Sequence, residues 1–219
     1  MKLQYLGDSK DSFKWDYHDY LANALGAGSL KILWLLTPDD NSNDGASAPD
    51  KFGASAKILE LCRDLKRTRD PELLLEMPRF TNSSYQVSFF EKQPSAIAML
   101  REQFFKDVRL DKAQLIFIDP DNGFEPRTTT SAKHVKYDDL RLLIEIVPED
   151  AVISVFQHHR RKKFTQDYAE ISERLAHPFM TAIYWHSLMF VSITKNADKL
   201  EHVIRANIEY AKHKPVQII

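Results

Sequence analysis

The sequence has little cysteine, little glycine and no surplus of either charge. One cysteine in 219 residues, Cys62, excludes a disulfide framework and a cysteine-based metal knuckle. None of the P-loop, G-x-S-x-G, H-E-x-x-H and G-x-G-x-x-G motifs occurs. A net charge of −1 gives no whole-molecule attraction to nucleic acid or to an anionic membrane. Because no apolar run approaches 18 residues and no signal peptide opens the chain, we expect a soluble cytoplasmic protein without membrane partners.

The apolar fraction of 43% is enough for a packed core, and its pattern alternates between strands and helices. Helices are expected at residues 10–25, 54–67, after 71, after 94, at 164–175 and at 198–212. Strands are expected at 30–36, 85–90, 114–118 and 151–156, with a hairpin at 181–185 and 188–194. We therefore predict one Rossmann-like domain over 1–219, a three-layer α/β sandwich with a mainly parallel sheet closed by a C-terminal antiparallel hairpin.

Polar residues cluster where the predicted parallel strands end. In open parallel sheets, ligands bind outside the carboxyl ends of the strands. We therefore expect the functional site at this edge, beside the helix at 10–25 and the long loop at 38–53. A loop of that length in a compact domain is usually functional or mobile.

The first motif is Gly7-Asp8-Ser9-Lys10-Asp11-Ser12-Phe13-Lys14-Trp15. At 100° per residue, Asp8, Asp11 and Lys14 share a stripe with Trp15 and His18, opposite the apolar face. Two carboxylates beside a lysine suit a metal, a sugar hydroxyl or a substrate amine. The structural alternative is a helix cap by Asp8 or Ser9, with Asp11 favourable to the helix dipole. An exposed tryptophan in this stripe favours a functional role.

The second motif, Ile118-Asp119-Pro120-Asp121-Asn122-Gly123-Phe124-Glu125-Pro126, follows a buried strand. A turn accounts for Pro120, Asn122 and Gly123. It does not account for Asp119, because a carboxylate where strand burial ends is paired, hydrated or functional. The functional interpretation is the stronger one here.

The third motif, Phe156-Gln157-His158-His159-Arg160-Arg161-Lys162-Lys163, places four cations and two imidazoles after another buried strand. Cations are unfavourable at a helix N-terminus, so the run suits an anion such as phosphate, or the acidic motif itself. A shared metal site is not expected, because adjacent residues in extended chain point to opposite faces. Separately, Glu91 ends a strand, where an acid commonly holds ribose hydroxyls in nucleotide-binding sheets.

Four of these segments together resemble a family of bacterial proteins without an assigned activity. That family carries G-D-x-x-D-x-x-K, T-P-D-D, D-P-D-N-G and Q-H in this order. The corresponding residues here are Gly7 to Lys14, Thr37-Pro38-Asp39-Asp40, Asp119 to Gly123 and Gln157-His158. The resemblance covers most of the chain and implies a shared site.

More distantly, the chain resembles class I S-adenosylmethionine-dependent methyltransferases that modify ribosomal-RNA adenine. Their G-N-x-x-D-x-x-K-H is similar to Gly7–Lys14, their D-P-P-Y to Asp119-Pro120-Asp121-Asn122, and their S-G-M-F-V to Ser187–Val191. Two features differ. The first strand is followed by no glycine loop, and the stacking ring of D-P-P-Y is missing unless Phe124 supplies it.

The resemblance implies an S-adenosylmethionine-dependent methyltransferase acting on nucleic acid or a nucleotide-like substrate. Its implied cofactor residues are Thr37, Asp39, Glu91 and Asp119. Its implied catalytic residues are Asp119, Asp121, Asn122, Lys14 and Asp11, and its substrate or phosphate contacts are Asp8, Gln157, His158, Arg160 and Arg161.

Two alternatives stay open. In a Mg²⁺-dependent nuclease or phosphodiesterase, the metal ligands are expected to be Asp8, Asp11, Asp119, Asp121 and Glu125. In a catalytically inactive Rossmann-like module, the same pocket binds a ligand without turnover.

Overall fold

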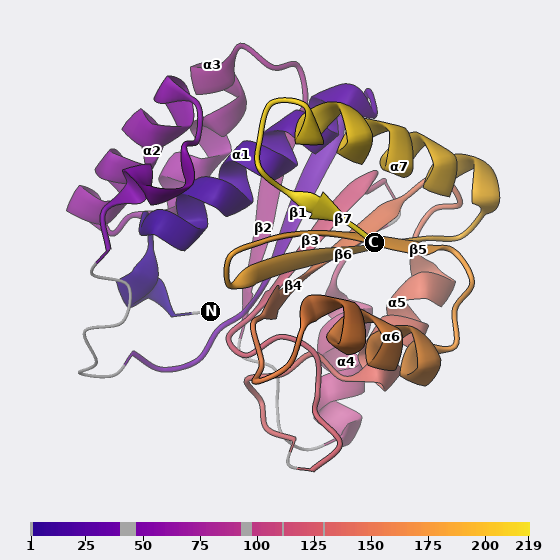
Figure 1. The fold of residues 1–219 in the computed structure, drawn as a ribbon. Coiled ribbons are helices and arrows are strands. Elements are labelled where there is room, and N and C mark those ends of the chain that lie inside the picture. The colour runs from indigo at the N-terminus through magenta and orange to yellow at the C-terminus, as the bar shows by residue number, and fades with distance from the viewer. Residues whose placement is uncertain (1, 40–46, 93–97, 111, 129) are drawn as a thin grey trace.

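The structure is a computed structural model in which one seven-stranded sheet forms the centre (Figure 1). It describes residues 2–39, 47–92, 98–110, 112–128 and 130–219, and for 91, 92 and 98–100 it describes only the backbone. The strand order is β2-β1-β3-β4-β6-β5-β7. The strands are β1 (Ser29–Leu35), β2 (Gln86–Lys92), β3 (Leu115–Pro120), β4 (Val152–His158), β5 (Met180–Trp185), β6 (Leu188–Thr194) and β7 (Gln217–Ile218).

The sheet has a parallel part and an antiparallel part. Strands β2, β1, β3 and β4 pair in parallel, whereas β6 runs antiparallel to both β4 and β5. The predicted Rossmann-like α/β fold with a closing antiparallel hairpin is therefore confirmed. The hairpin turn uses His186 in the left-handed region at φ 51°, a conformation that tight two-residue turns require.

The connections place a topological switch point between β1 and β3. From β1 the chain moves outward to β2, and then returns across β1 to β3, which pairs with β4. The register sets Trp34 opposite Asp119 and Leu35 opposite Pro120, so both strands end side by side. Ligands of open α/β sheets bind at such a point, outside the carboxyl ends of the strands.

Helices cover both faces of the sheet and form two hydrophobic clusters (Figure 1). One cluster joins the sheet to α1 (Ser9–Ala24), α2 (Ala56–Thr68) and α7 (Ala197–Ala211). The other joins it to α4 (Ala98–Asp107), α5 (Tyr137–Ile146) and α6 (Phe164–Leu175). Shorter elements are η1 (Leu3–Tyr5), η2 (Pro49–Phe52), η3 (Pro71–Glu76) and α3 (Met77–Thr81). As far as the structure describes them, none of these helices is long and apolar enough to cross a bilayer.

Helix α1 differs from the expected surface helix. Trp15, expected in an exposed stripe, is fully buried and packs edge-on against Phe117 with the ring centroids 5.8 Å apart. His18 is also buried, between the Lys14 carbonyl oxygen at 2.7 Å and the Ser154 hydroxyl at 2.9 Å. The cause is that α1 contacts the sheet, η2, α2, α3 and α7, so that its polar stripe faces protein. Trp15 and His18 are therefore core residues.

Candidate functional site

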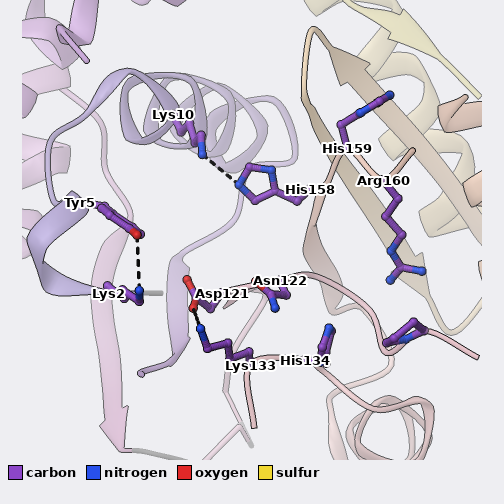
Figure 2. A pocket seen from close by; sticks show the side chains of 11 residues that line it. Lys2, Tyr5, Lys10, Asp121, Asn122, Lys133, His134, His158, His159 and Arg160 are labelled. Carbon is purple, nitrogen blue, oxygen red and sulfur yellow. Dashed lines mark hydrogen bonds and ion pairs between the residues drawn. The ribbon is translucent and has the colours of Figure 1, made fainter. Parts of the chain in front are cut away.

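Two adjoining cavities open at the carboxyl ends of β3 and β4. The larger, of about 630 Å³, is here called the mouth, and Figure 2 shows its lining residues. The smaller, of about 30 Å³, is called the floor. Tyr5, Lys10, Asp121 and His158 line both. The floor adds Asp8, Asp11, Lys14, Asp119, Pro120 and Phe156, and the mouth adds Lys2, Asn122, Pro126, Lys133, His134, His159 and Arg160.

Lys14 joins the first and second motifs at the floor. Its ammonium lies 3.1 Å from Asp11 and 2.8 Å from Asp119, and all three side chains are nearly completely buried. It also sits 4.8 Å from the ring centroid of Phe156 on β4. Since a buried carboxylate needs a partner, Lys14 explains why Asp119 is tolerated where β3 ends.

The expected cap of α1 is confirmed. The Asp8 carboxylate accepts the backbone N–H groups of Lys10 at 2.8 Å and Asp11 at 2.9 Å. Asp11 accepts the backbone N–H of Gly7 at 2.9 Å in addition to the ammonium of Lys14. Gly7 has φ 75°, and a Cβ there would lie 2.2 Å from the Cys62 carbonyl oxygen. The motif thus fixes the start of α1 and also supplies carboxylates to the cavity.

Burial, opposed by Lys14, sets the protonation of the floor. It raises the pKa of Asp11 to about 7 and raises the pKa of Asp8 above its ordinary value. The carboxylates of Asp119 and Asp11 outweigh the burial of Lys14 and raise the pKa of its ammonium. Near neutral pH the floor therefore combines the charged ammonium of Lys14 with an Asp11 carboxyl group that is partly protonated.

Hydrogen bonds join the second motif to the third. The Gln157 amide oxygen accepts the backbone N–H of Phe124 at 2.8 Å, beside Gly123 at φ 83°. A Cβ on Gly123 would lie 2.2 Å from that oxygen, so the turn requires glycine. The Phe124 side chain is fully buried in the hydrophobic cluster that includes α5, so it cannot supply the missing stacking ring. Gln157 is likewise buried and positions the loop.

A polar contact bridges the switch point. The Thr37 hydroxyl, just after β1, donates to Asp121 at 3.0 Å, and Lys133 lies 3.6 Å from the same carboxylate. Asn122, the next residue, is exposed in the mouth. The expected catalytic residues Asp11, Lys14, Asp119, Asp121 and Asn122 therefore lie around one connected space.

His158 is a neutral imidazole at the boundary of the two cavities (Figure 2). Its Nε2 atom lies 3.0 Å from the Lys10 ammonium, which can only donate, so Nε2 accepts and the ring proton resides on Nδ1. Burial and then the nearby charges of Lys10 and Lys14 lower the pKa of His158 to about 3. The ring can accept a hydrogen bond here but carries no positive charge at neutral pH.

The basic run divides into parts with different surroundings. Arg160 lines the mouth, donates to the Phe124 carbonyl oxygen and lies 3.5 Å from Asp167 of α6. Lys162 pairs with Glu170 of α6 at 2.6 Å. Arg161, an expected phosphate contact, is exposed and does not line the cavities. Arg160 and Lys162 thus pair with carboxylates of α6, and of the four cations in this run only Arg160 lines the candidate site.

The residues expected to bind the cofactor lie in different surroundings. Asp119 lines the floor, whereas Thr37 is buried at the switch point and Asp39 is exposed, accepting the Gln4 backbone N–H at 3.2 Å. Glu91 pairs with Trp34 through the backbone near the end of β2, and its side chain lies outside the described residues. Residues 40–46 and 93–97, which follow β1 and β2, also lie outside them, including Asp40 of the T-P-D-D motif.

The expected Mg²⁺ ligands do not form a metal site. Asp8 caps α1, Asp11 and Asp119 hold Lys14, and Asp121 accepts from Thr37. Glu125 accepts the backbone N–H of Tyr137 at 2.9 Å and the Thr130 hydroxyl at 3.1 Å. In the part of the chain that the structure describes, no three His, Cys, Asp or Glu side chains are grouped to hold a metal ion. A lysine fills the centre of the carboxylate cluster instead.

Four residues that line the mouth lie outside the three motifs: Lys2, Tyr5, Lys133 and His134. Lys10 and His159 lie inside the first and third motifs, but neither was predicted to have a role of its own. Lys133 and His134 reach the mouth because Phe124 and Val135 form a β-bridge and the Asn122 N–H donates to the Lys133 carbonyl oxygen at 2.9 Å. No local sequence motif indicates this pairing, because the paired residues lie more than ten positions apart in the chain. Tyr5 lies two residues before the first motif and Lys10 lies within it, so this proximity is a sequence signal for both.

Comparisons with known proteins identify no family. No family model matches the chain, and no curated protein matches its sequence. Among solved structures, human methyltransferase-like protein 13 in complex with SAH shows 10% sequence identity and a TM-score of 0.41, over 90% of this chain and 91% of that chain. A likeness at this level assigns no function. The resemblances noted above therefore rest on their sequence motifs.

Proposed function

We propose that the protein is an S-adenosylmethionine-dependent methyltransferase that modifies an amino group of a nucleic acid or nucleotide-like substrate. The observation that carries the proposal is the set of acceptors at the carboxyl end of β3. Asp119, Asp121 and Asn122 lie there beside the switch point with β1, where open α/β sheets bind their ligands.

These acceptors suit an amine that must be oriented. Lys14 fixes Asp119 from the floor, and Thr37 fixes Asp121 from the end of β1. Hydrogen bonds from the two N–H groups of an amine to these oxygens point its lone pair away from them. Orientation of this kind contributes on the order of several kcal/mol to a transfer reaction.

The cofactor side of the site is the end of β1 and of β2. Thr37, Asp39, Glu91 and Asp119 are the residues that would hold S-adenosylmethionine. When bound, that cofactor supplies a methyl group on a sulfonium sulfur, which leaves as a thioether. Asp121 lines both cavities. In this proposal it would take the proton that the acceptor nitrogen loses.

The substrate side is the mouth. His158 and Arg160 line the mouth, while Gln157 holds the loop that carries Asp121 and Asn122, and Asp8 caps the helix that carries Lys14. Donors and cations of this kind suit the phosphate of a nucleotide.

The test is calorimetric titration of the folded protein with S-adenosylhomocysteine. We expect micromolar binding that Glu91→Ala weakens at least about tenfold, since hydrogen bonds to charged groups contribute about 1.5–3 kcal/mol. Glu102→Ala, an exposed acid on α4, is the matched control and should bind as wild type does. Absence of binding to folded protein contradicts the proposal.

A transfer assay separates an enzyme from a binding module. Methyl-labelled S-adenosylmethionine is incubated with RNA, DNA and nucleotide pools, and incorporated label is measured for wild type and Asp121→Asn. Transfer that Asp121→Asn reduces at least about a hundredfold, a loss typical of an essential positioning group, supports the proposal. Binding of S-adenosylhomocysteine without transfer to any pool identifies the inactive module instead.

A further inference from the structure

We propose that the mouth binds a single phosphate group of a small phosphorylated molecule of mononucleotide size, and not a strand of nucleic acid. The anion site is argued from the lining of the mouth alone, and the reaction at the bound molecule rests on the proposed methyl transfer. Among the described residues, four permanent cations and one carboxylate line the mouth: Lys2, Lys10, Lys133, Arg160 and Asp121.

The cationic groups come from separate elements and surround one space (Figure 2). Arg160 follows β4 and is held by the Phe124 carbonyl oxygen and by Asp167. Lys133 comes from the long β3–α5 connection and lies 3.6 Å from Asp121. These contacts restrict both side chains before a ligand arrives, which lowers the entropic cost of binding an anion.

The surface next to the cavity carries charges of both signs. Arg127 lies 3.0 Å from Glu173 and Lys162 lies 2.6 Å from Glu170, while Arg161 and Lys163 are exposed. The whole chain carries a net charge of −1. A protein that follows a nucleic-acid backbone typically neutralises about six to ten phosphates. The mouth gathers four cationic side chains, which is fewer than that and suits a single phosphate group.

The size and the polarity of the space favour a small molecule. A cavity of about 630 Å³ lies within the range of roughly 300–1,000 Å³ that small-molecule sites occupy. Asp121 and the neutral His158 join the cationic mouth to the acidic floor. A fitting ligand therefore has a phosphate at one end and an amino or hydroxyl donor at the other.

The experiment compares binding of the four nucleoside 5′-monophosphates, their nucleosides and 12-nucleotide single strands, with and without saturating S-adenosylhomocysteine. We expect at least one monophosphate to bind about tenfold or more tightly than its nucleoside. We expect the 12-mer to gain no affinity over that monophosphate. The slope of log K against log salt concentration should be shallower than about −2, whereas six or more backbone contacts give about −4 or steeper.

Lys133→Gln tests whether this lysine contributes to the anion site. Another lysine of the chain serves as its matched control. Lys106 on α4 is equally exposed, at 49% against 45%, and is also paired with a single carboxylate. Lys133→Gln should weaken monophosphate binding about tenfold, and Lys106→Gln should leave it unchanged. Equal effects of the two substitutions contradict the assignment.

The outcomes separate this inference from the proposed function. Monophosphate binding without any S-adenosylhomocysteine binding supports the anion site and overturns the methyltransferase. S-adenosylhomocysteine binding with no monophosphate bound overturns the anion site and leaves the methyltransferase standing. Affinity that rises with strand length, with a steep salt slope, overturns the small-molecule substrate in favour of nucleic acid.

Discussion

The floor and the mouth of the cavity hold their charges in opposite ways. At the floor, Asp8, Asp11, Lys14 and Asp119 are each at most 4% exposed, and each carries a partner from the protein. At the mouth, the side chains of Arg160 and Lys133 are 19% and 45% exposed. A charge that water cannot reach must be compensated within the fold, whereas a charge at the surface needs no such partner. The charges of the floor are therefore held in place by the fold itself, whereas the side chains of the mouth can adjust to a ligand.

The largest expected effect comes from removing the cation of the floor. Lys14→Met leaves Asp11 and Asp119 buried without their ammonium, which we expect to lower the free energy of unfolding by about 3–5 kcal/mol. Lys133→Met at the mouth should change it by less than about 1 kcal/mol. Urea denaturation of both variants measures the difference. Similar losses would show that the floor is not the buried network described.

The loop between floor and mouth gives the next effect. Gly123→Ala places a Cβ against Gln157 at φ 83° and should cost about 2 kcal/mol. Gly53→Ala is the control, because its φ is 55° but nothing lies within 4 Å of the added carbon, so it should cost about 1 kcal/mol. Thermal unfolding compares the two. A smaller loss for Gly123→Ala would mean that Gln157 does not clamp this loop.

The protonation of His158 and that of Asp11 should change the stability of the fold with pH in opposite directions. The folded-state pKa of His158 is lowered to about 3, so between about pH 6.5 and 3 only the unfolded chain takes up that proton and stability falls as pH falls. The pKa of Asp11 is raised to about 7, so between about pH 4 and 7 the folded chain retains a proton and stability falls as pH rises.

Two substitutions separate these contributions. His158→Asn should remove up to about 1.4 kcal/mol per pH unit of acid destabilisation, and Asp11→Asn should remove a similar slope of opposite sign. Urea midpoints from pH 4 to 7 give both slopes. Changes of the same sign in the two variants would exclude this assignment of protonation.

The smallest expected effect is at the switch point. Thr37→Val removes the hydroxyl that donates to Asp121 and should cost about 1 kcal/mol of stability. If β1 contributes to the cofactor side, the same variant should also weaken S-adenosylhomocysteine binding. Thr68→Val, which removes a hydroxyl bonded to the Asp64 carbonyl oxygen at the exposed end of α2, controls for the loss of a hydroxyl. A binding loss in both variants would remove Thr37 from the site.

Most of the parallel sheet could be predicted, because its strands are continuous apolar runs that end at polar residues. The patterns located β1, β3, β4 and the β5–β6 hairpin to within one or two residues. Helix α5 and strand β7 were not expected. Leu140 and Leu143 of α5 recur at helical spacing, whereas the two residues of β7 are too short to show a period.

The sequence by itself determined the edge at which the polar residues gather and which motifs contribute to it. It could not decide that Lys14 occupies the centre of the carboxylates, since this depends on α1 packing across the ends of β3 and β4. Nor could it show that Arg160 faces the cavity while Lys162 faces α6, or that the β-bridge at Val135 brings Lys133 to the mouth. Local patterns fix the period and polarity of an element, whereas the partner of a buried charge is chosen by whichever distant element packs against it.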